Sequence, residues 1–472
     1  MQLQAPLLVS GDSAAAAGAD ERAPAPPLEH ATSDAPATTA AWPCLAPLPA
    51  PTMEIPPLVS TKIRILSFVA ILMVVYIHSF NEDPKVIEPY TKLKSELNFQ
   101  VFVQFFLAGA ALRWTVPFFF VVSGYLFFVH KQDDCDLGFH FVRRIESRVT
   151  SVLVPYVYWQ LVAIFAILIL LLIPGLEANW PWFSYVKSWN LLDIVWNTLA
   201  KQPVAFQLWY LRDLFIMALL SPAFYYLHRY RLLLAVPLAF AYPWVLNLFL
   251  FSAWKVYILN LDSLVFFPIG AYFALAKVDL ERKMSVAAYA GTTGVFLLMC
   301  VLKTALSFSE STDANVLLVL YKLSFFPGIV SFWYTYDVIA SFYARDHDQS
   351  VALEGGIDQG ADEMAAERTC CRVPVLQVWR FLDWGSAYTL FLYCAHEPLM
   401  GCTIDNLIVL FDVTGVRLNF AGNLGKFLLF LLVPIVWVAL LFGVALAMQK
   451  YIPAYYAILT GGRTASPQAK KK

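Results

Sequence analysis

The residues best suited to chemistry in this sequence are ionisable side chains inside long apolar stretches: His78, Arg113, Arg212, Asp213, Asp262 and Lys322. A charged group at bilayer depth costs several kcal/mol unless it is paired or hydrated, so each is a functional candidate by default. Measured from the ends of the apolar stretches, all of them fall in the outer third of the predicted membrane. This clustering predicts a water-filled cavity that opens to the outer side.

Separate snorkelling to the outer headgroups is the alternative explanation for Arg113 and Lys322, whose long side chains can reach water alone. It explains Arg212 and Asp213 less well. Neighbouring residues in a helix point about 100° apart, so at least one of these two side chains faces the protein interior.

Two histidines have the chemistry to move a proton near neutral pH. His78 ends the first apolar stretch, where an imidazole is suited to act as a general base toward a hydroxyl group. The alternative is a polar residue at the membrane interface. His396, next to Glu397, lies within a later stretch. It either contacts substrate or forms a structural hydrogen bond between helices.

Three arginines, Arg143, Arg144 and Arg148, stand together at the start of the third long apolar stretch. Arg144 and Arg148 are four residues apart and therefore share one helical face. Such a cluster either sets membrane topology or forms a phosphate-binding entrance, for which the guanidinium fork is suited. Both interpretations fit the sequence.

The composition requires a membrane. Of 472 residues, 59% are apolar and 14% are charged, against about 45–50% and roughly 25% in soluble domains. Apolar stretches long enough to cross the bilayer recur at 62–80, 114–130, 151–173, 207–228, 232–251, 257–276, 285–303, 317–341, 387–410 and 424–448. Residues 99–112 are predicted to form a re-entrant or interfacial piece. The sequence therefore predicts an all-α integral membrane protein with about ten transmembrane helices.

With both termini cytoplasmic, most Lys and Arg residues fall on the cytoplasmic side, as the positive-inside rule requires. Residues 1–56 are rich in Ala and Pro and are predicted to be disordered. Residues 57–450 form the predicted transmembrane domain, with a flexible cytoplasmic insert at about 342–378, and 451–472 form a short basic tail. The net charge of −1 gives no argument for nucleic-acid binding. The seven cysteines lack the spacing of a metal site.

Six motifs, in chain order, resemble acyltransferase family three, the multi-pass membrane acyltransferases that modify sugars and surface polysaccharides. They are IRILSFVAILMVVYIHSF, RWTVPFFFVVSGYLFF, RRIESRVTSVLVPYVYW, FQLWYLRDLFIMALLSP, FFPIGAYFA and SAYTLFLYCAHEPLM. The similarity runs from about 62 to 448 and is to members without an additional hydrolase-like domain. The sequence departs from the family at Ser67, where members usually have a basic residue eleven positions before the histidine. Arg64 or Lys62 is the candidate replacement.

The resemblance implies that an acyl group, expected to be acetyl, moves from acyl-CoA to a hydroxyl of a carbohydrate or glycolipid. It implies a catalytic His78 and a CoA phosphate site at Arg143, Arg144 and Arg148. Substrate binding is expected at Arg64, Arg113, Ser123, Tyr125, Trp209, Arg212, Asp213 and His396. Acyl-CoA is expected as a donor substrate, with no permanently bound cofactor and no metal.

Two other functions remain open from the residues alone. A transporter or flippase would use the same outer cavity to bind and release solute, and Pro222, Pro243 and Pro268 offer modest helix interruptions for it. A receptor or scaffold would keep the fold without activity. The expected location is the plasma membrane or bacterial inner membrane, or an endomembrane in a eukaryote.

Overall fold

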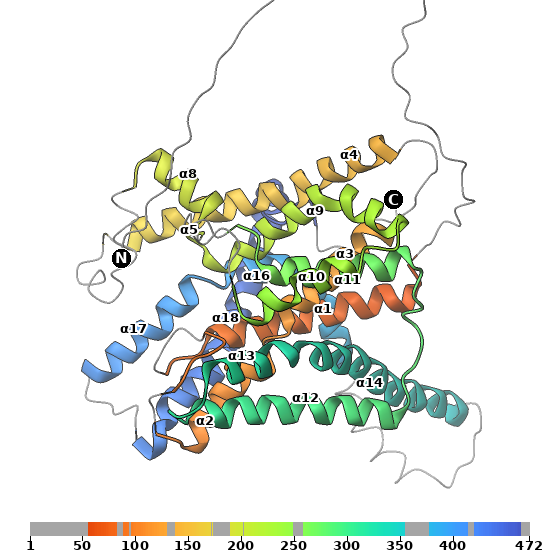
Figure 1. Cartoon of the computed structure of the whole chain (residues 1–472). Coiled ribbons are helices and arrows are strands. Elements are labelled where there is room, and N and C mark those ends of the chain that lie inside the picture. The colour runs from red at the N-terminus through yellow and green to blue at the C-terminus, as the bar shows by residue number, and fades with distance from the viewer. Residues whose placement is uncertain are drawn as a thin grey trace, which may run out of the picture. The chain divides into compact units, whose positions relative to one another are not determined.

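All described residues belong to one compact unit, 48–472. The computed structural model describes residues 55–82, 88–93, 96–129, 137–170, 172, 189–201, 203–248, 258–354, 377–413 and 420–463. These residues form helices and connections without a single strand, in agreement with the all-α prediction (Figure 1). Nearly all of the predicted disordered segment 1–56 lies outside the described residues. So does 355–376 of the predicted insert, whereas its first part continues the helix that ends at Glu354.

The first half of the unit contains α1 (Pro57–His78), α2 (Phe99–Phe105), the π-helix η1 (Phe106–Ala111), α3 (Thr115–Val129), α4 (Leu137–Arg148), the π-helix η2 (Val149–Leu153), α5 (Val154–Leu170), α8 (Leu191–Ala200), the 3₁₀ helix η3 (Phe206–Leu208) and α9 (Trp209–Arg229). The second half contains α10 (Ala235–Val245), α11 (Leu261–Leu275), α12 (Val286–Ser307), α13 (Ala314–Leu323), α14 (Phe325–Glu354), α16 (Thr389–Ala395), α17 (Leu399–Val413), α18 (Phe420–Tyr451) and α19 (Pro453–Leu459).

Six helical segments among the described residues are long and apolar enough to cross a bilayer: Pro57–His78, Phe99–Val129, Phe141–Leu170, Val286–Ser307, Ala314–Ser341 and Asn423–Tyr451. Ala235–Val245, Leu261–Leu275 and Leu399–Ile408 are shorter apolar helices. The chain is thus a multi-pass membrane protein by length and composition. The count of about ten spans and the orientation of the termini stay predictions.

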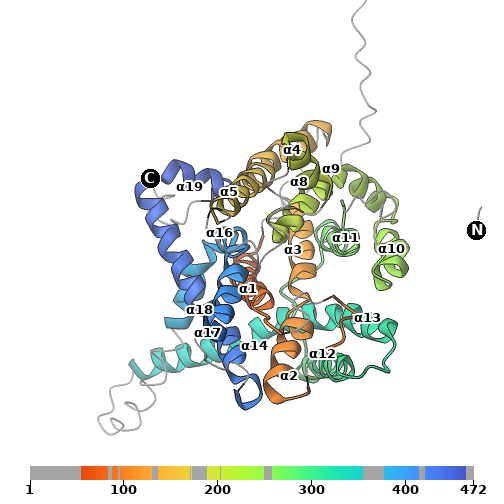
Figure 2. The same ribbon diagram turned by 90° about the vertical axis from the view of Figure 1, so that its left-hand side faces the viewer.

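Helix α1 lies in the middle of the described helices (Figures 1 and 2). It packs against α3, η1, α14, α16 and α18. Apart from Lys62, its buried side chains are apolar, for example Phe68, Ala70 and Val75, which are fully buried. From Phe68 to Ile77 the helix is apolar on every side, which suits this central position. His78, its last residue, is partly buried.

Helices α3 and α11 pack with their backbones in direct contact. A Cβ atom added to Gly270 would lie 1.9 Å from the carbonyl oxygen of Val121, and one added to Gly124 would lie 2.2 Å from that of Phe267. Small residues allow such close approach between membrane helices, where van der Waals packing stabilises the association. The SGY segment of the motif RWTVPFFFVVSGYLFF therefore contacts the PIG segment of the motif FFPIGAYFA.

The π-helix η1 joins α2 to α3 and is held by two cations. Lys303 of α12, only 1% exposed, donates from Nζ to the Gly109 carbonyl at 2.9 Å. Arg113 donates from Nε to the Ala108 carbonyl. The last carbonyls of a helix lack intrahelical partners and carry partial negative charge, so cations bind there favourably. Residues 99–112, predicted as a re-entrant or interfacial piece, are here the first part of a longer helical segment that includes α3.

Asp262 and Lys322 form an ion pair at 3.1 Å, and the Trp244 indole N–H donates to the same carboxylate at 2.6 Å. Lys322 is 3% exposed. Its charge is thus neutralised inside the protein, and snorkelling does not explain it.

Candidate active site

The rings of His78 and His396 lie next to each other, tilted by 43°, although the two residues come from distant parts of the chain. Their ring centroids are 5.3 Å apart, and the ring of Phe206 is also 5.3 Å from that of His78. His78 ends α1, Phe206 begins η3, and His396 directly follows α16. The packing of α16 on α1 brings the two imidazoles together.

His396 is fully buried and has one ring nitrogen without a partner. Its Nδ1 is 3.1 Å from the Leu392 carbonyl, whereas its Nε2 has no hydrogen-bond partner. A carbonyl can only accept, so the network assigns the proton to Nδ1 and leaves Nε2 as a free acceptor. The Trp437 indole N–H donates to the His396 carbonyl at 3.1 Å and fixes the backbone. This arrangement leaves a buried basic nitrogen available to a ligand.

The predicted span 387–410 consists of two helices, α16 and α17, separated at His396, Glu397 and Pro398. Pro398 lacks an N–H and disfavours helical backbone in Glu397, so the helix ends there. Gln207 occupies the gap, and its side-chain amide donates to the carbonyls of Cys394 at 3.1 Å and Glu397 at 2.7 Å. The Tyr393 hydroxyl donates back to the Gln207 carbonyl. Helix η3 is thereby fixed against the histidine pair.

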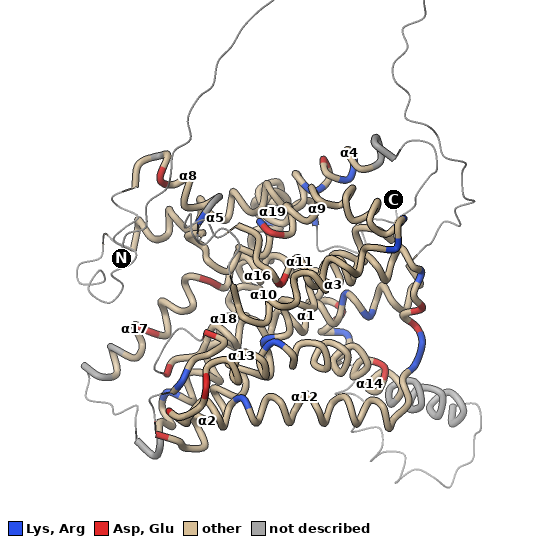
Figure 3. The backbone as a smooth tube through the Cα atoms, in the orientation of Figure 1, with Lys and Arg blue, Asp and Glu red and all other residues tan. Residues whose placement is uncertain are grey.

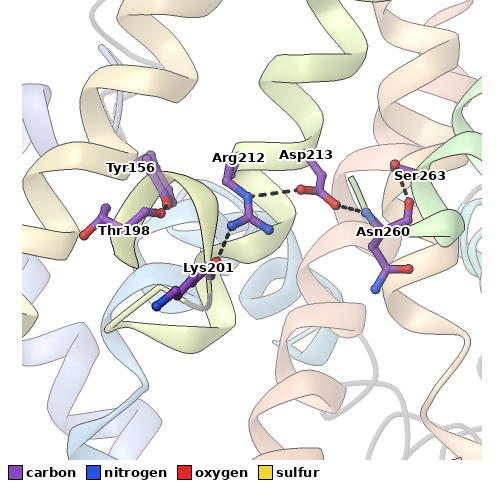
Figure 4. A network of polar contacts seen from close by, with 7 residues as sticks. All are labelled: Tyr156, Thr198, Lys201, Arg212, Asp213, Asn260 and Ser263. Carbon is purple, nitrogen blue, oxygen red and sulfur yellow. Dashed lines mark hydrogen bonds and ion pairs between the residues drawn. The ribbon is translucent and has the colours of Figure 1, made fainter. Parts of the chain in front are cut away.

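Arg212 and Asp213 form a buried network near the start of α9 (Figure 4). Arg212 donates from Nη1 to the Lys201 carbonyl at 2.6 Å and from Nε to Asp213 at 3.3 Å. Asp213 also accepts the Asn260 backbone N–H at 2.6 Å. These contacts connect the segment before α9 with the start of α11. Arg212 and Asp213 therefore stabilise the fold, in addition to the substrate binding that was predicted for them.

Arg144 and Arg148 lie together against Phe127 of α3, with guanidinium carbons 5.6 and 5.5 Å from the ring centroid. Arg144 also donates to the Phe127 carbonyl. Arg143 is exposed, whereas the side chains of Arg144 and Arg148 are partly buried. Figure 3 shows Lys and Arg along α4 and in the connection from α11 to α12. The predicted one-sided pair of arginines is thus present, and the third arginine is not part of it.

Hydroxyl-bearing and aromatic side chains lie between these arginines and the histidines. Ser123, about one helical turn from Phe127, shares a 2.8 Å hydrogen bond with the Tyr210 hydroxyl. The Tyr210 ring is 5.8 Å from that of Tyr393, which in turn is 6.4 Å from that of His396. These contacts form a continuous row, which we call the tyrosine row: Ser123, Tyr210 and Tyr393.

The other predicted substrate residues are distributed unevenly around this row. Trp209 packs on Phe120 with ring centroids 6.1 Å apart, and Tyr125 is buried in the core. Arg113 interacts electrostatically with His78. Arg64 does not approach the histidines: fourteen residues of helix separate it from His78, about 21 Å at 1.5 Å per residue. Its partner is Asp383, and both side chains are about half exposed.

Sequence reasoning did not single out four residues that complete the site, namely Phe206, Gln207, Tyr210 and Tyr393. All four stand inside the two motifs FQLWYLRDLFIMALLSP and SAYTLFLYCAHEPLM. The signal was therefore present as a motif, but the motif gave no reason to prefer these side chains over their neighbours.

The comparisons with known proteins give one match. The family model described as "Acyltransferase domain", that of acyltransferase family three, matches residues 62–448. Searches among curated proteins and among solved structures found no match. The matched residues include most of α1, the tyrosine row, His78 and His396, and they make up most of the chain. The chain therefore belongs to acyltransferase family three and is a membrane acyltransferase.

Proposed function

We propose that this acyltransferase moves an acyl group, expected to be acetyl, from acyl-CoA to a hydroxyl of a carbohydrate or glycolipid. The observation that carries the proposal is the His78–His396 pair, with ring centroids 5.3 Å apart and one buried nitrogen without a partner. A hydroxyl group has to lose its proton as it attacks a thioester, and a neutral imidazole is the common protein base for that step.

The donor enters at Arg144 and Arg148. Two guanidinium groups on one helical face suit the phosphates of CoA, because each presents a planar fork of N–H donors. From there the pantetheine arm extends along the tyrosine row toward His396. This route requires the arginines to face the cytoplasm, where acyl-CoA is present, and agrees with the predicted orientation of the termini.

The reaction needs one proton acceptor and one site for negative charge. His78 takes the proton of the acceptor hydroxyl while the hydroxyl oxygen forms a bond to the thioester carbonyl carbon. The carbonyl oxygen becomes negatively charged, and Arg113 stabilises this charge. The carbon–sulfur bond then breaks, and the thiolate leaves as CoA after taking the proton from the imidazolium. His396, with Nε2 as acceptor, orients the hydroxyl toward His78.

A covalent variant uses the same groups. His78 attacks the thioester carbonyl carbon, the carbon–sulfur bond breaks, and the thiolate leaves as CoA with the proton that the acylated imidazolium gives up. The acceptor hydroxyl then takes the acyl group from His78 while His396 takes the hydroxyl proton, which leaves His78 as a free imidazole. In both versions the two imidazoles have to lie near one hydroxyl group, which their separation permits.

The test is the transfer of labelled acetyl from acetyl-CoA into glycans or lipids of membranes that contain the wild-type protein, His78→Ala or His228→Ala at equal protein levels. His228, at the far end of α9, contacts only the Tyr272 ring among the described aromatic side chains and is the matched control. We expect incorporation by wild type and His228→Ala and its loss in His78→Ala, and the labelled product identifies the acceptor. Absence of incorporation by folded wild-type protein in its native membrane would contradict the proposal and favour the transporter or flippase.

A further inference from the structure

The end of α19 forms a tight turn that fixes Arg463. Gly461 and Gly462 have φ of +60° and +78°, a backbone region that favours glycine. The Gly462 N–H donates to the Ala457 carbonyl at 2.7 Å, and the Thr460 hydroxyl donates to the Arg463 carbonyl at 3.0 Å. This is a glycine-terminated helix end, which satisfies the last carbonyls and sets the direction of the next residue. The predicted short basic tail thus begins with an ordered helix and turn.

The turn packs against the π-helix that follows Arg148. A Cβ atom on Gly461 would lie 2.6 Å from the Ser151 carbonyl oxygen, so the two backbones touch. The Trp159 indole N–H donates to the Leu459 carbonyl at 3.0 Å and joins α5 to α19. Tyr456, on the same helix, is 1% exposed. The segment after α18 therefore returns to the elements that directly follow the arginine pair.

This return brings Arg463 close to Arg148. Both guanidinium groups lie within electrostatic range of the Tyr210 hydroxyl and of each other. Arg463 also lies within electrostatic range of Cys394, two residues before His396. Among the residues that the structure describes, neither arginine has a carboxylate within ion-pair distance. Both side chains remain accessible to solvent.

Two like charges held together by rigid elements are unfavourable unless an anion lies between them. The glycine turn and the Trp159 hydrogen bond fix the backbone of Arg463 next to the π-helix that follows Arg148, so the two residues cannot separate without breaking these contacts. The arrangement is that of an anion site assembled from two distant parts of the chain. Phosphate suits it because each guanidinium can donate two parallel hydrogen bonds to phosphate oxygens.

From this geometry we infer that Arg463 is a donor-binding residue, which contacts the phosphates of acyl-CoA together with Arg148. The inference rests on the proposed function and extends its donor site to the last described residue of the chain. Since Arg463 also approaches Tyr210 and Cys394, it marks the inner edge of the phosphate site, where the pantetheine arm begins.

The experiment measures binding of CoA, and separately of pantetheine, to the purified full-length protein in lipid nanodiscs by calorimetry. The variants are Arg463→Ala, Arg463→Lys and Lys450→Ala. Lys450, near the end of α18, is exposed and lies over the Tyr451 ring. The control variant Lys450→Ala therefore removes one positive charge from the helix that precedes α19. Thermal unfolding of each variant shows whether it is folded.

We expect Arg463→Ala to weaken CoA binding by roughly tenfold or more, the loss typical of a charge-assisted hydrogen bond. Arg463→Lys should lose less, Lys450→Ala nothing, and pantetheine, which lacks the nucleotide phosphates, should bind all four proteins equally. If wild type and Arg463→Ala bind CoA equally well, the role of Arg463 is overturned and the proposed function stands. A folded wild-type protein that does not bind CoA would overturn both. If Arg463→Ala does not fold, unchanged CoA binding by Arg463→Gln decides against the inference in the same way.

Discussion

The Lys62 ammonium of α1 lies 2.7 Å from the Asp337 carboxylate of α14, inside the protein and over the ring of Trp333. Lys62 is 2% exposed. Lys62 is a better candidate than Arg64 for a basic residue that acts inside the domain, because Lys62 forms a buried ion pair, whereas Arg64 and its partner Asp383 are about half exposed. The buried pair connects α1 to α14; it does not bring a charge to His78.

Lys62→Met should lower the free energy of unfolding by about 1–3 kcal/mol, because it leaves Asp337 largely enclosed and without its cation. The double variant Lys62→Met with Asp337→Leu should recover much of the loss. Arg64→Met is the control, since an exposed pair contributes about 0–1 kcal/mol. Unfolding in detergent micelles measures all three. Equal losses for Lys62→Met and Arg64→Met would show that the buried pair has no special weight.

His396→Gln should lower the turnover number by about 10²-fold or more while the protein stays folded, because it removes the free basic nitrogen beside His78. The double variant with His78→Ala should be little slower than His78→Ala alone, as expected for residues that act as one unit. Initial rates of acyl transfer test this. Rate losses that multiply would mean that the two histidines act in separate steps.

Gly270→Ala should destabilise the protein by at least about 2 kcal/mol, because its Cβ would lie 1.9 Å from the Val121 carbonyl oxygen and force α3 and α11 apart. Gly291→Ala in α12 meets no atom within 4 Å, and should be neutral or stabilise by up to about 1 kcal/mol through helix propensity. The yield of folded protein in size-exclusion chromatography distinguishes the two. A normal yield of Gly270→Ala would contradict the tight backbone contact.

Arg212→Ala should lower abundance and activity together. It leaves the fully buried Asp213 without its cation, a loss of about 3–5 kcal/mol for buried pairs. Arg113→Ala, by contrast, should lower turnover more than abundance. Membrane abundance and specific activity, measured on the same samples, separate the two cases. A slow but fully abundant Arg212→Ala would restore the predicted role of Arg212 in substrate binding.

The fold class was predictable because apolar length alone identifies membrane helices, and a described helix lies in each predicted stretch. Hydropathy, however, does not register a break in the backbone. The stretch 387–410 was therefore expected as one helix, although Pro398 signals the gap that positions His396. Likewise, 317–341 contains the end of α13 and the start of α14.

The site was only partly predictable, because distances across the bundle depend on packing. The shared depth of the charged residues suggested one hydrated cavity, yet Asp262 and Lys322 satisfy each other directly, and Arg212 and Asp213 bind neighbouring backbone. The depth of a residue along its helix does not show whether its charged side chain is paired with another side chain or hydrated by water. The pairing of His78 with His396 required the contact between α1 and α16.

The two cations on η1 have a mechanical consequence. Lys303 and Arg113 each donate to a carbonyl of this π-helix, Lys303 from α12 and Arg113 from the turn before α3. Straightening η1 into an ordinary helix would take these carbonyls away and leave the Lys303 ammonium without its acceptor in the interior. The junction between α2 and α3 is therefore a stiff brace, which resists bending as substrates enter and products leave. Any opening of the domain during turnover should hinge elsewhere.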